Sequence, residues 1–359
     1  MKRIMFVAPV LKYGGAEKNF IGVANFAAES DYEVFLLSEG NGSAMRYINP
    51  KIKQIELKTC SSSSFIKRYC HTIKSIRKEV VKNKIDLVVS FIEPWRSASI
   101  IATRFSKAKC VVSERADPYS RGGRHDGVIF KIFSLADGHV FQTEQARDFF
   151  GERVRRKSRV IPNPVFKEDA FQKYEGPKKD VIVSIARLDI KQKRQDILIK
   201  AFAKIESKFP NYKLLLYGNG PDEQKIKDLI LELHLEDKAF LMGVTHDVYS
   251  ALGESKIMVL TSDFEGIPNA IIESLCAGVP VVSTKCSPGG AELLINDNEN
   301  GLLVERGDIA GVAEAITKIL KDEALAEKFV NNGLSVKERF DFDLIMKKWI
   351  SYFESVIQG

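Results

Sequence analysis

No stretch of the sequence approaches the roughly 20 consecutive apolar residues that a helix needs to span a bilayer. Cysteine is scarce: the chain has five, an odd number, with no Cys-x-x-Cys pair. This usage argues against a disulfide framework or a zinc site and fits a reducing cytoplasm. The five histidines are scattered, and none is paired with another at the spacing of metal ligands. The sequence therefore predicts neither a membrane-spanning protein nor a metalloprotein.

At 359 residues the chain is long enough for two domains whose cores need no covalent support. Its composition, 45% hydrophobic and 28% charged, is that of a soluble globular protein and excludes a disordered chain or a fibre. The first residues carry the charges of a signal peptide but too short an apolar stretch, so we expect a β-strand there.

Positive charge is concentrated in the first half. Residues 1–165 contain 29 Lys and Arg against 16 Asp and Glu, a net charge of +13, whereas the remainder has 25 against 31, a net charge of −6. Such a split points to a polyanionic or membrane-surface partner for the basic half. The alternative is an unevenly charged surface that contacts only solvent.

Short apolar runs alternate with helical stretches along the chain, which is typical of parallel sheets covered by helices on both faces. In the first half we expect strands at 4–8, 34–37, 53–57, 87–91, 110–113, 139–142 and 159–161. In the second half we expect strands at 181–185, 213–217, 239–242, 257–260, 281–283 and 302–304. Helices are expected at 16–28, 65–83, 144–150, 194–207 and 222–233.

The pattern breaks near Pro162-Asn163-Pro164 and restarts at Val181. We therefore expect an α/β protein of two Rossmann-like, doubly wound domains, at 1–165 and 180–339, with a hinge at 166–179. Two such domains that face each other would border a ligand cleft at the carboxyl ends of their strands. The segment 340–359 is expected to be a helix that packs back toward the N-terminal domain.

Two glycines, Gly14 and Gly15, follow the first expected strand and precede a helix. Such a turn lets backbone amides approach a phosphate or a sugar, although a tight turn alone explains the pair as well. The spacing is not Gly-x-Gly-x-x-Gly, and no acidic residue ends the second strand as in NAD-binding proteins.

In the second half, four cations follow the strand that ends near Ile185: Arg187, Lys191, Lys193 and Arg194. Cations at the carboxyl end of a strand suit a diphosphate, which Arg binds through two hydrogen bonds and Lys attracts as a point charge. A solvated basic loop is the alternative. The next strand runs into the turn Gly218-Asn219-Gly220-Pro221.

Two glutamates eight positions apart, Glu265 and Glu273, flank a loop-to-helix junction. The carboxylate of Glu273 can accept both hydroxyls of a ribose. By spacing alone such a pair is commonplace. The amides expected to be free at this helix start can donate to phosphate or sugar oxygens; they belong to Gly266, Ile267, Asn269 and Ala270.

Together these segments resemble glycosyltransferase family 4, and the resemblance covers essentially the whole chain. In the second half it rests on Arg187 to Lys193, the 218–221 turn, and Glu265-x7-Glu273 with the tail Ala277-Gly278-Val279-Pro280-Val281-Val282. In the first half it rests on Gly14-Gly15-Ala16-Glu17-Lys18, Ser113-Glu114-Arg115-Ala116-Asp117-Pro118 and Ile161-Pro162-Asn163-Pro164-Val165. The Ser-Glu-Arg-x-Asp-Pro pattern is most similar to transferases that build bacterial O-antigen, capsule and exopolysaccharide repeats on lipid carriers.

The resemblance implies the GT-B fold and a role for each matching residue. Arg187 and Lys193 would hold the donor diphosphate and neutralise the departing nucleotide, Glu273 would bind the ribose, and Glu265 with the amides after it would bind the transferred sugar and the distal phosphate. Catalytic roles would thus fall to Arg187, Lys193 and Glu265. Further donor contacts would come from Gly15, Gly218 and Val244.

One position departs from the family pattern. Many members carry a histidine near the donor sugar where this chain has Arg115, and an arginine cannot act as a base near neutral pH. Arg115, with Glu114, is therefore expected to contact a sugar hydroxyl or an acceptor phosphate.

The implied activity is the retaining transfer of a hexose or N-acetylhexosamine from a nucleotide sugar, with UDP as the nucleotide, to a lipid-diphosphate-linked glycan. No cofactor or essential metal is implied, and no Asp-x-Asp stands at a strand end; Asp297-Asn298-Glu299 lies in a polar turn. A GT-B nucleotide-sugar epimerase is the alternative, although no acid–base set is evident around the sugar. A nucleic-acid-binding protein is disfavoured because the sequence has no recognised nucleic-acid-binding motif. An inactive scaffold is disfavoured because the charged residues of the donor site are retained.

Much of the positive excess lies on the segment 65–82. Apolar residues recur there at spacings of three and four, which predicts one apolar face made of Ile66, Tyr69, Ile73, Ile76 and Val80. The basic residues expected to bind anionic lipid or a lipid diphosphate are Lys67, Arg68, Lys74, Arg77 and Lys78. The alternative is a core-facing helix with a solvated basic side. We expect a cytoplasmic protein held peripherally at the inner face of the cell membrane, with no nucleic-acid partner.

Overall fold

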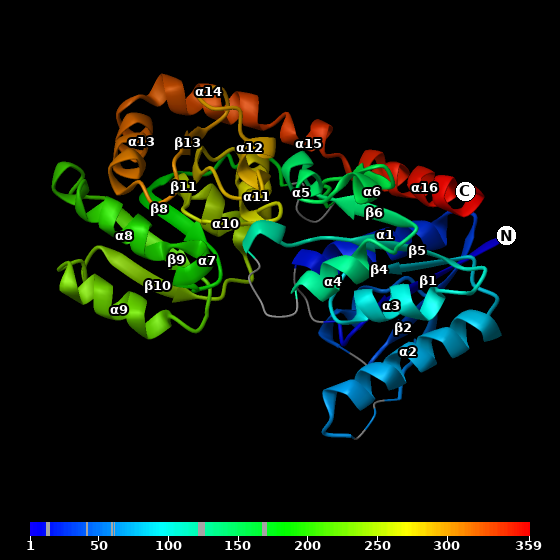
Figure 1. The fold of residues 1–359 in the computed structure, drawn as a ribbon. Coiled ribbons are helices and arrows are strands. Elements are labelled where there is room, and N and C mark those ends of the chain that lie inside the picture. Colours follow the sequence, from blue (N-terminus) through cyan, green and yellow to red (C-terminus); the bar gives the residue numbers. More distant parts are fainter. Residues whose placement is uncertain (12–14, 41, 59, 61, 121–125, 167–170) are drawn as a thin grey trace. The chain divides into compact units, whose positions relative to one another are not determined.

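The computed structural model describes residues 1–359 except 12–14, 41, 59, 61, 121–125 and 167–170 (Figure 1). The chain forms two compact units: Met1–Pro164 with Asp343–Gly359 is unit 1, and Val165–Phe342 is unit 2. Each unit contains one parallel sheet with helices packed on it. The expected α/β fold class with two parallel sheets is therefore confirmed.

Unit 1 has a seven-stranded sheet in the order β3-β2-β1-β4-β5-β6-β7. The order reverses between β1 and β4, which is the switch point of a doubly wound sheet. The strands are β1 (Lys2–Ala8), β2 (Tyr32–Ser38), β3 (Lys53–Glu56), β4 (Leu87–Ser90), β5 (Lys109–Ser113), β6 (Gly138–Phe141) and β7 (Ser158–Val160). The helices are α1 (Gly15–Glu29), α2 (Phe65–Lys82), α3 (Trp95–Thr103), α4 (Asp126–Phe133), α5 (Glu144–Asp148), α6 (Glu152–Arg155) and α16 (Phe342–Gln358).

Unit 2 has a six-stranded sheet in the order β10-β9-β8-β11-β12-β13, with its switch point between β8 and β11. The strands are β8 (Lys179–Ile185), β9 (Lys213–Tyr217), β10 (Ala239–Gly243), β11 (Ser255–Leu260), β12 (Val281–Thr284) and β13 (Leu302–Val304). The helices are α7 (Ile190–Lys193), α8 (Gln195–Ala203), α9 (Glu223–Glu232), α10 (Val248–Gly253), α11 (Asn269–Ala277), α12 (Gly290–Leu294), α13 (Ile309–Lys321), α14 (Glu323–Gly333) and α15 (Val336–Arg339).

The central strands are continuous apolar runs because both faces of each sheet are covered. All four residues of β4 and of β12 are buried. In unit 2 the helices α8 and α13 supply one core, around Phe202 and Ile316, and α11 supplies the other, around Ile271 and Leu275. The loops at the carboxyl ends of the strands are thus carried on a rigid frame.

One helix is shorter than the sequence predicts. In place of a helix at 194–207, α8 runs from Gln195 to Ala203, and the left-handed conformation of Arg194 (φ 49°) separates it from the short helix α7. Within the expected hinge, residues 167–170 lie outside the described residues. Tyr174 belongs to unit 2, where its N–H donates to the carbonyl of Ala277 at 3.0 Å.

The C-terminal helix α16 completes the core of unit 1. Trp349 is fully buried and stacks on Phe91, which follows β4, with 5.3 Å between the ring centroids. Phe353 contacts both Trp349 and Phe6 of β1. The hydroxyl of Tyr352 accepts the N–H of His139 at 2.8 Å, at the start of β6. The last residues of the chain are therefore part of the first unit's core.

Replacing Trp349 with alanine should lower the free energy of unfolding of unit 1 by about 3–5 kcal/mol, because a large buried ring leaves a cavity. Urea unfolding followed by circular dichroism measures the change. Lys347, exposed on the same helix, gives the matched control: Lys347→Ala should stay within about 0.5 kcal/mol of the wild type. Equal stability of the two variants would contradict the placement of α16.

Candidate functional site

The candidate donor site of unit 2 is built on two loops at its switch point. The loop after β8 and the loop after β11 are tied together by side-chain hydrogen bonds. Thr261 Oγ1 donates to the carbonyls of Lys193 at 3.1 Å and Arg194 at 2.8 Å, and Gln192 Nε2 donates to the carbonyl of Phe264 at 3.1 Å. Ligands of doubly wound sheets bind at this edge, outside the carboxyl ends of the strands.

Lys193 and Glu265 form an ion pair across these loops. The ammonium of Lys193 contacts Oε1 of Glu265, and the hydroxyl of Ser262 donates to the same oxygen at 2.7 Å. The side chains are only 17% and 8% exposed, so their attraction is screened far less than that of a surface pair. The structure thus brings together two of the three residues predicted to be catalytic.

Arg194 has a different role from the other cations of its loop. Its guanidinium bonds Asp196 at 3.0 and 3.1 Å and Asp263 at 2.9 Å, so it joins the start of α8 to the loop after β11. These carboxylates raise the pKa of Arg194 further above its ordinary value. The sequence predicted that Arg194 binds the diphosphate and gave no indication of its bond to Asp263. The only sequence signal for an internal role was Asp196, which lies two residues after Arg194.

Arg187, the third residue predicted to be catalytic, lies in the same loop but points to solvent. Its side chain is 63% exposed, and Nη2 is 3.9 Å from the nearest carboxylate oxygen, on Asp189. An ion pair so exposed and so long contributes little to stability. The guanidinium is therefore able to leave Asp189 for a bound anion.

Helix α11 begins between the two predicted glutamates. Glu265 lies in the preceding loop, and Glu273 lies on the second turn, four residues after the first helical residue, Asn269. The N–H groups of Gly266, Ile267 and Ala270 donate to no residue among those that the structure describes. Unpaired amides at a helix start carry partial positive charge and favour an anion.

Glycine is required where these loops pack closely. A Cβ on Gly290 would lie 1.8 Å from the carbonyl oxygen of Gly266, and a Cβ on Gly218 would lie 2.0 Å from that of Ala186. Gly218 also has φ 133°, and its N–H donates to the carbonyl of Gly243 at 2.8 Å. Val244, the predicted base contact, follows Gly243 and is exposed. Gly218 thus has a packing role whether or not it touches a ligand.

In unit 1 the predicted donor residue Gly15 is the first residue of α1, after β1. It is exposed, and its carbonyl accepts Nδ2 of Asn19 at 3.0 Å. Its neighbour in the motif, Gly14, lies outside the described residues. The position of Gly15 beside the switch point of unit 1 suits a ligand contact.

Glu114 is turned into the core of unit 1. It is 2% exposed, and Oε2 accepts Nη1 of the fully buried Arg96 at 3.0 Å. Oε1 accepts the N–H groups of Arg115 at 3.1 Å and Ala116 at 3.2 Å. The carboxylate therefore shapes the turn after β5 by bonds within unit 1, and its predicted contact with an acceptor stays a prediction.

Arg115, the next residue, lies on the other side of this turn between two rings. Its guanidinium carbon is 4.9 Å from the ring centre of Phe91 and 5.5 Å from that of Trp349. Nη1 is 3.4 Å from Oδ1 of Asn163, but Nε and Nη2 are buried with no hydrogen-bond partner among the described residues. Burial lowers the pKa of Arg115 to about 9. Arg115 is half-buried overall, and a cation with two buried nitrogens that lack hydrogen-bond partners is a candidate anion site.

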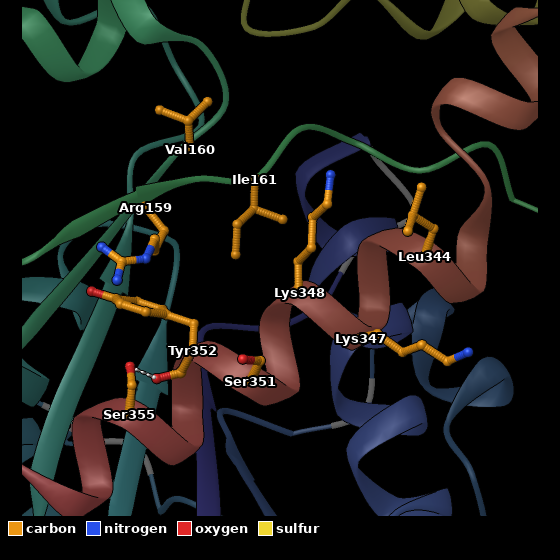
Figure 2. A pocket seen from close by; sticks show the side chains of 9 residues that line it. All are labelled: Arg159, Val160, Ile161, Leu344, Lys347, Lys348, Ser351, Tyr352 and Ser355. Carbon is orange, nitrogen blue, oxygen red and sulfur yellow. Dashed lines mark hydrogen bonds between the residues drawn. The ribbon is translucent and has the colours of Figure 1, made fainter.

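A groove of about 420 Å³ lies in unit 1 between β7 and α16. Figure 2 shows Arg159 beside the ring of Tyr352 and the side chain of Lys348 extending alongside Ile161, whereas Lys347 points away. Three cations and no carboxylate line the groove. None of the predicted site residues belongs to it, and the hydroxyl of Tyr352 is occupied by backbone groups.

Helix α2 has the predicted bounds within one residue, and its five predicted lipid-binding cations are all exposed. The predicted apolar face is only partly buried. Ile76 and Val80 are in the core and Tyr69 and Ile73 pack against it, but Ile66 is 72% exposed. The core-facing alternative therefore holds for Ile76 and Val80, with Tyr69 and Ile73 packed against them, and does not hold for Ile66.

Among the described residues, no helix is both long enough and apolar enough to cross a bilayer. Within the same part of the chain, no three His, Cys, Asp or Glu side chains are grouped as metal ligands would be.

Comparison with known proteins agrees with this geometry. Residues 165–336 match the family described as Glycosyl transferases group 1. The chain is 25% identical over 355 residues to an uncharacterized glycosyltransferase of Haemophilus influenzae, covering 97% of this chain and 99% of the relative. It is 24% identical over 362 residues, 99% of both chains, to the GalNAc-alpha-(1->4)-GalNAc-alpha-(1->3)-diNAcBac-PP-undecaprenol alpha-1,4-N-acetyl-D-galactosaminyltransferase of Campylobacter jejuni. The solved structure of Anabaena HepE in complex with UDP-glucose has a TM-score of 0.84 at 19% identity, covering 99% of this chain and 100% of that chain.

These findings define the class: the protein is a glycosyltransferase enzyme with the GT-B fold. More particularly, residues 165–336, which make up most of its second unit, match the group 1 family, and the enzyme is a hexosyltransferase. The sequence-based recognition is confirmed at this level, and family 4 within it stays a prediction.

Replacing Arg115 with methionine should stabilise the protein by about 1–3 kcal/mol at pH 7, because an unpaired buried charge is replaced by an apolar chain of similar length. At that pH, below the pKa of about 9, Arg115 is charged and the penalty is fully present; it declines as pH rises above 9. Urea unfolding at pH 7 measures the effect. A less stable variant would mean that the guanidinium is satisfied in the free protein.

Proposed function

We propose that the protein is a retaining transferase that moves a hexose or N-acetylhexosamine from a UDP-sugar to a lipid-diphosphate-linked glycan. The observation that supports a donor site is the group of cations and backbone amides at the switch point of unit 2. There the exposed guanidinium of Arg187, the ammonium of Lys193 and the backbone amides of Gly266, Ile267 and Ala270 form the kind of site that a nucleoside diphosphate requires. The complex of Anabaena HepE with UDP-glucose supports a UDP-sugar as the donor.

In the proposed reaction, the bond between the anomeric carbon and the diphosphate oxygen breaks while an acceptor hydroxyl attacks the same face of the sugar. The acceptor's proton passes to the released phosphate oxygen, so the step needs neither a protein base nor a metal. Arg187 and Lys193 stabilise the charge that develops on the departing UDP. An oxocarbenium-like sugar is the species that these groups must accommodate.

The two glutamates take different parts of the donor. Glu265 is already oriented by Lys193 and Ser262, so its carboxylate presents a fixed acceptor to the hydroxyls of the transferred sugar. Glu273, one turn into α11, binds the ribose hydroxyls. Amides at the helix start bind the distal phosphate.

A lipid-diphosphate acceptor is supported by two observations. Unit 1 carries the positive excess, and the Campylobacter jejuni relative is named for an undecaprenol diphosphate-linked substrate. Arg115 is proposed to bind an anionic group of this acceptor, since its buried nitrogens lack a partner. The chain would work at the cytoplasmic face of the cell membrane, through α2.

Glu273→Ala should weaken UDP-glucose binding roughly ten- to hundredfold, because it removes charged hydrogen bonds to the ribose. Thermal unfolding in a series of nucleotide sugars measures this, since a ligand at 100 times its Kd stabilises by about 2.7 kcal/mol. Glu327→Ala, at an exposed glutamate of α14, is the matched control and should respond like the wild type. Unchanged affinity of Glu273→Ala would contradict the ribose assignment.

The same samples separate the transferase from an epimerase. A transferase leaves the UDP-sugar's configuration unchanged when no acceptor is present, apart from slow hydrolysis. Accumulation of the epimeric UDP-sugar in that incubation, followed by NMR, would overturn the proposal.

Reversing the charge of Lys67, Arg68, Lys74 and Lys78 together should abolish sedimentation with phosphatidylglycerol vesicles at low salt, because each cation near an anionic surface contributes about 1 kcal/mol. A matched control reverses four cations of unit 2 that border a surface groove there: Lys204, Lys208, Lys318 and Lys321. The control should still sediment. If both variants sediment, α2 has no part in membrane binding.

A further inference from the structure

Phe105 is placed where neither local conformation nor packing accounts for a large apolar side chain. It follows α3, has φ 61° and is 93% exposed. A bulky side chain is disfavoured in the left-handed region, where glycine or asparagine is usual. Among the described residues, its ring contact is with its neighbour Arg104, whose guanidinium carbon lies 5.7 Å from the ring centre.

The structure places Phe105 beside the carboxyl-terminal half of α2. Nη1 of Arg77 donates to the carbonyl of Arg104 at 2.8 Å, and the hydroxyl of Tyr69 donates to Oγ of Ser97 at 2.9 Å. These two bonds hold α2 alongside α3, as Figure 1 shows. The backbone immediately before Phe105 is thus bonded to the turn of α2 that carries Arg77.

Exposed apolar residues of α2 continue this feature. Val81, one turn after Arg77, is 64% exposed, and Ile66 and Cys70 are exposed on the same side of the helix by their spacing of four and eleven residues. We name Ile66, Cys70, Val81 and Phe105 the apolar ridge. Exposed apolar side chains rimmed by polar residues are typical of surfaces that contact a partner or a membrane.

Cations surround the ridge. Lys74 and Lys78 lie on α2 next to it, and Arg104 and Lys107 flank Phe105. Within the described part of the chain, none of these four side chains has an ion-pair partner. The one acidic residue of α2, Glu79, lies near Lys82 and bonds Asn83.

We propose that Phe105 is a membrane anchor that enters the acyl region of an anionic bilayer while the surrounding cations bind lipid phosphates. The partner is a lipid surface because exposed apolar side chains stand beside cations that have no ion-pair partner among the described residues, and a bilayer supplies both acyl chains and phosphates. This inference rests on the proposed function only in assigning unit 1 to a lipid-linked acceptor. It adds an apolar component that the basic helix alone does not supply.

The two components respond differently to salt. Attraction between cations and lipid phosphates weakens as ionic strength rises, whereas burial of a phenylalanine ring in lipid does not. The anchor therefore predicts residual vesicle binding at high salt that depends on Phe105.

The test places tryptophan at the anchor. Phe105→Trp should show a blue-shifted emission and strong quenching by vesicles of phosphatidylglycerol and brominated phosphatidylcholine, over the background of the buried Trp95 and Trp349. Leu231→Trp, at an exposed leucine of α9 in unit 2, is the matched control and should be quenched no more than the wild type.

Partitioning gives the second measurement. Phe105→Asn should bind these vesicles roughly ten- to hundredfold more weakly at high salt, the loss expected for one aromatic ring. Asparagine tolerates the left-handed conformation, so the variant should unfold at the same temperature as the wild type or higher. Its thermal shift with UDP-glucose should equal that of the wild type.

The outcomes separate the two proposals. Absence of quenching at Phe105→Trp, or unchanged partitioning of Phe105→Asn, overturns the anchor while donor binding stays intact. Loss of UDP-glucose binding by the wild type instead overturns the proposed function. If Phe105→Asn abolishes a concentration-dependent self-association seen without lipid, the ridge binds a second copy of the chain and the anchor is wrong.

Discussion

The candidate donor site depends on the pairing of charges across the switch point of unit 2. Lys193 pairs with Glu265 and Arg194 pairs with Asp263, so the loop after β8 supplies both cations and the loop after β11 supplies both carboxylates. Both loops follow parallel strands whose carboxyl ends share one edge of the sheet. Because the scaffold fixes the loops and the ion pairs fix their side chains, little reorganisation is needed when an anion binds there.

Much of this arrangement follows from the sequence. Strands such as Lys213–Tyr217 and Leu302–Val304 have the expected bounds, since buried parallel strands are short apolar runs between turn residues. Helix α3 was not predicted, because Arg96, Ser97 and Ser99 obscure its apolar pattern, and the buried ion pair of Arg96 with Glu114 is invisible in a single sequence. The short helix α7 was not predicted either. Arg194, whose left-handed backbone separates α7 from α8, is held by a contact with Asp263 that is distant in sequence.

The turn after β5 shows why adjacent residues take separate roles. Glu114 points inward to Arg96, whereas Arg115 lies between Phe91 and Trp349, in keeping with the alternation of side chains at the end of a strand. The sequence predicted a common role for Glu114 and Arg115 because they are adjacent charges. The contact of Arg115 with Trp349 could not be foreseen, because Trp349 lies on α16, more than 200 residues later. An unpaired buried cation weakens the fold, and functional sites are where such strain is retained.

The membership of α16 in unit 1 bears on how the chain matures during synthesis. The sheet of unit 1 is complete by residue 160, yet Trp349 and Phe353, which fill its core, are translated only after the whole of unit 2. All of unit 2, residues 165–342, leaves the ribosome before the core of unit 1 can be completed by α16. During synthesis, Phe6 and Phe91 of unit 1 therefore stay incompletely covered until α16 has been made. A chain truncated before α16 would leave those rings exposed to chaperones and prone to aggregation.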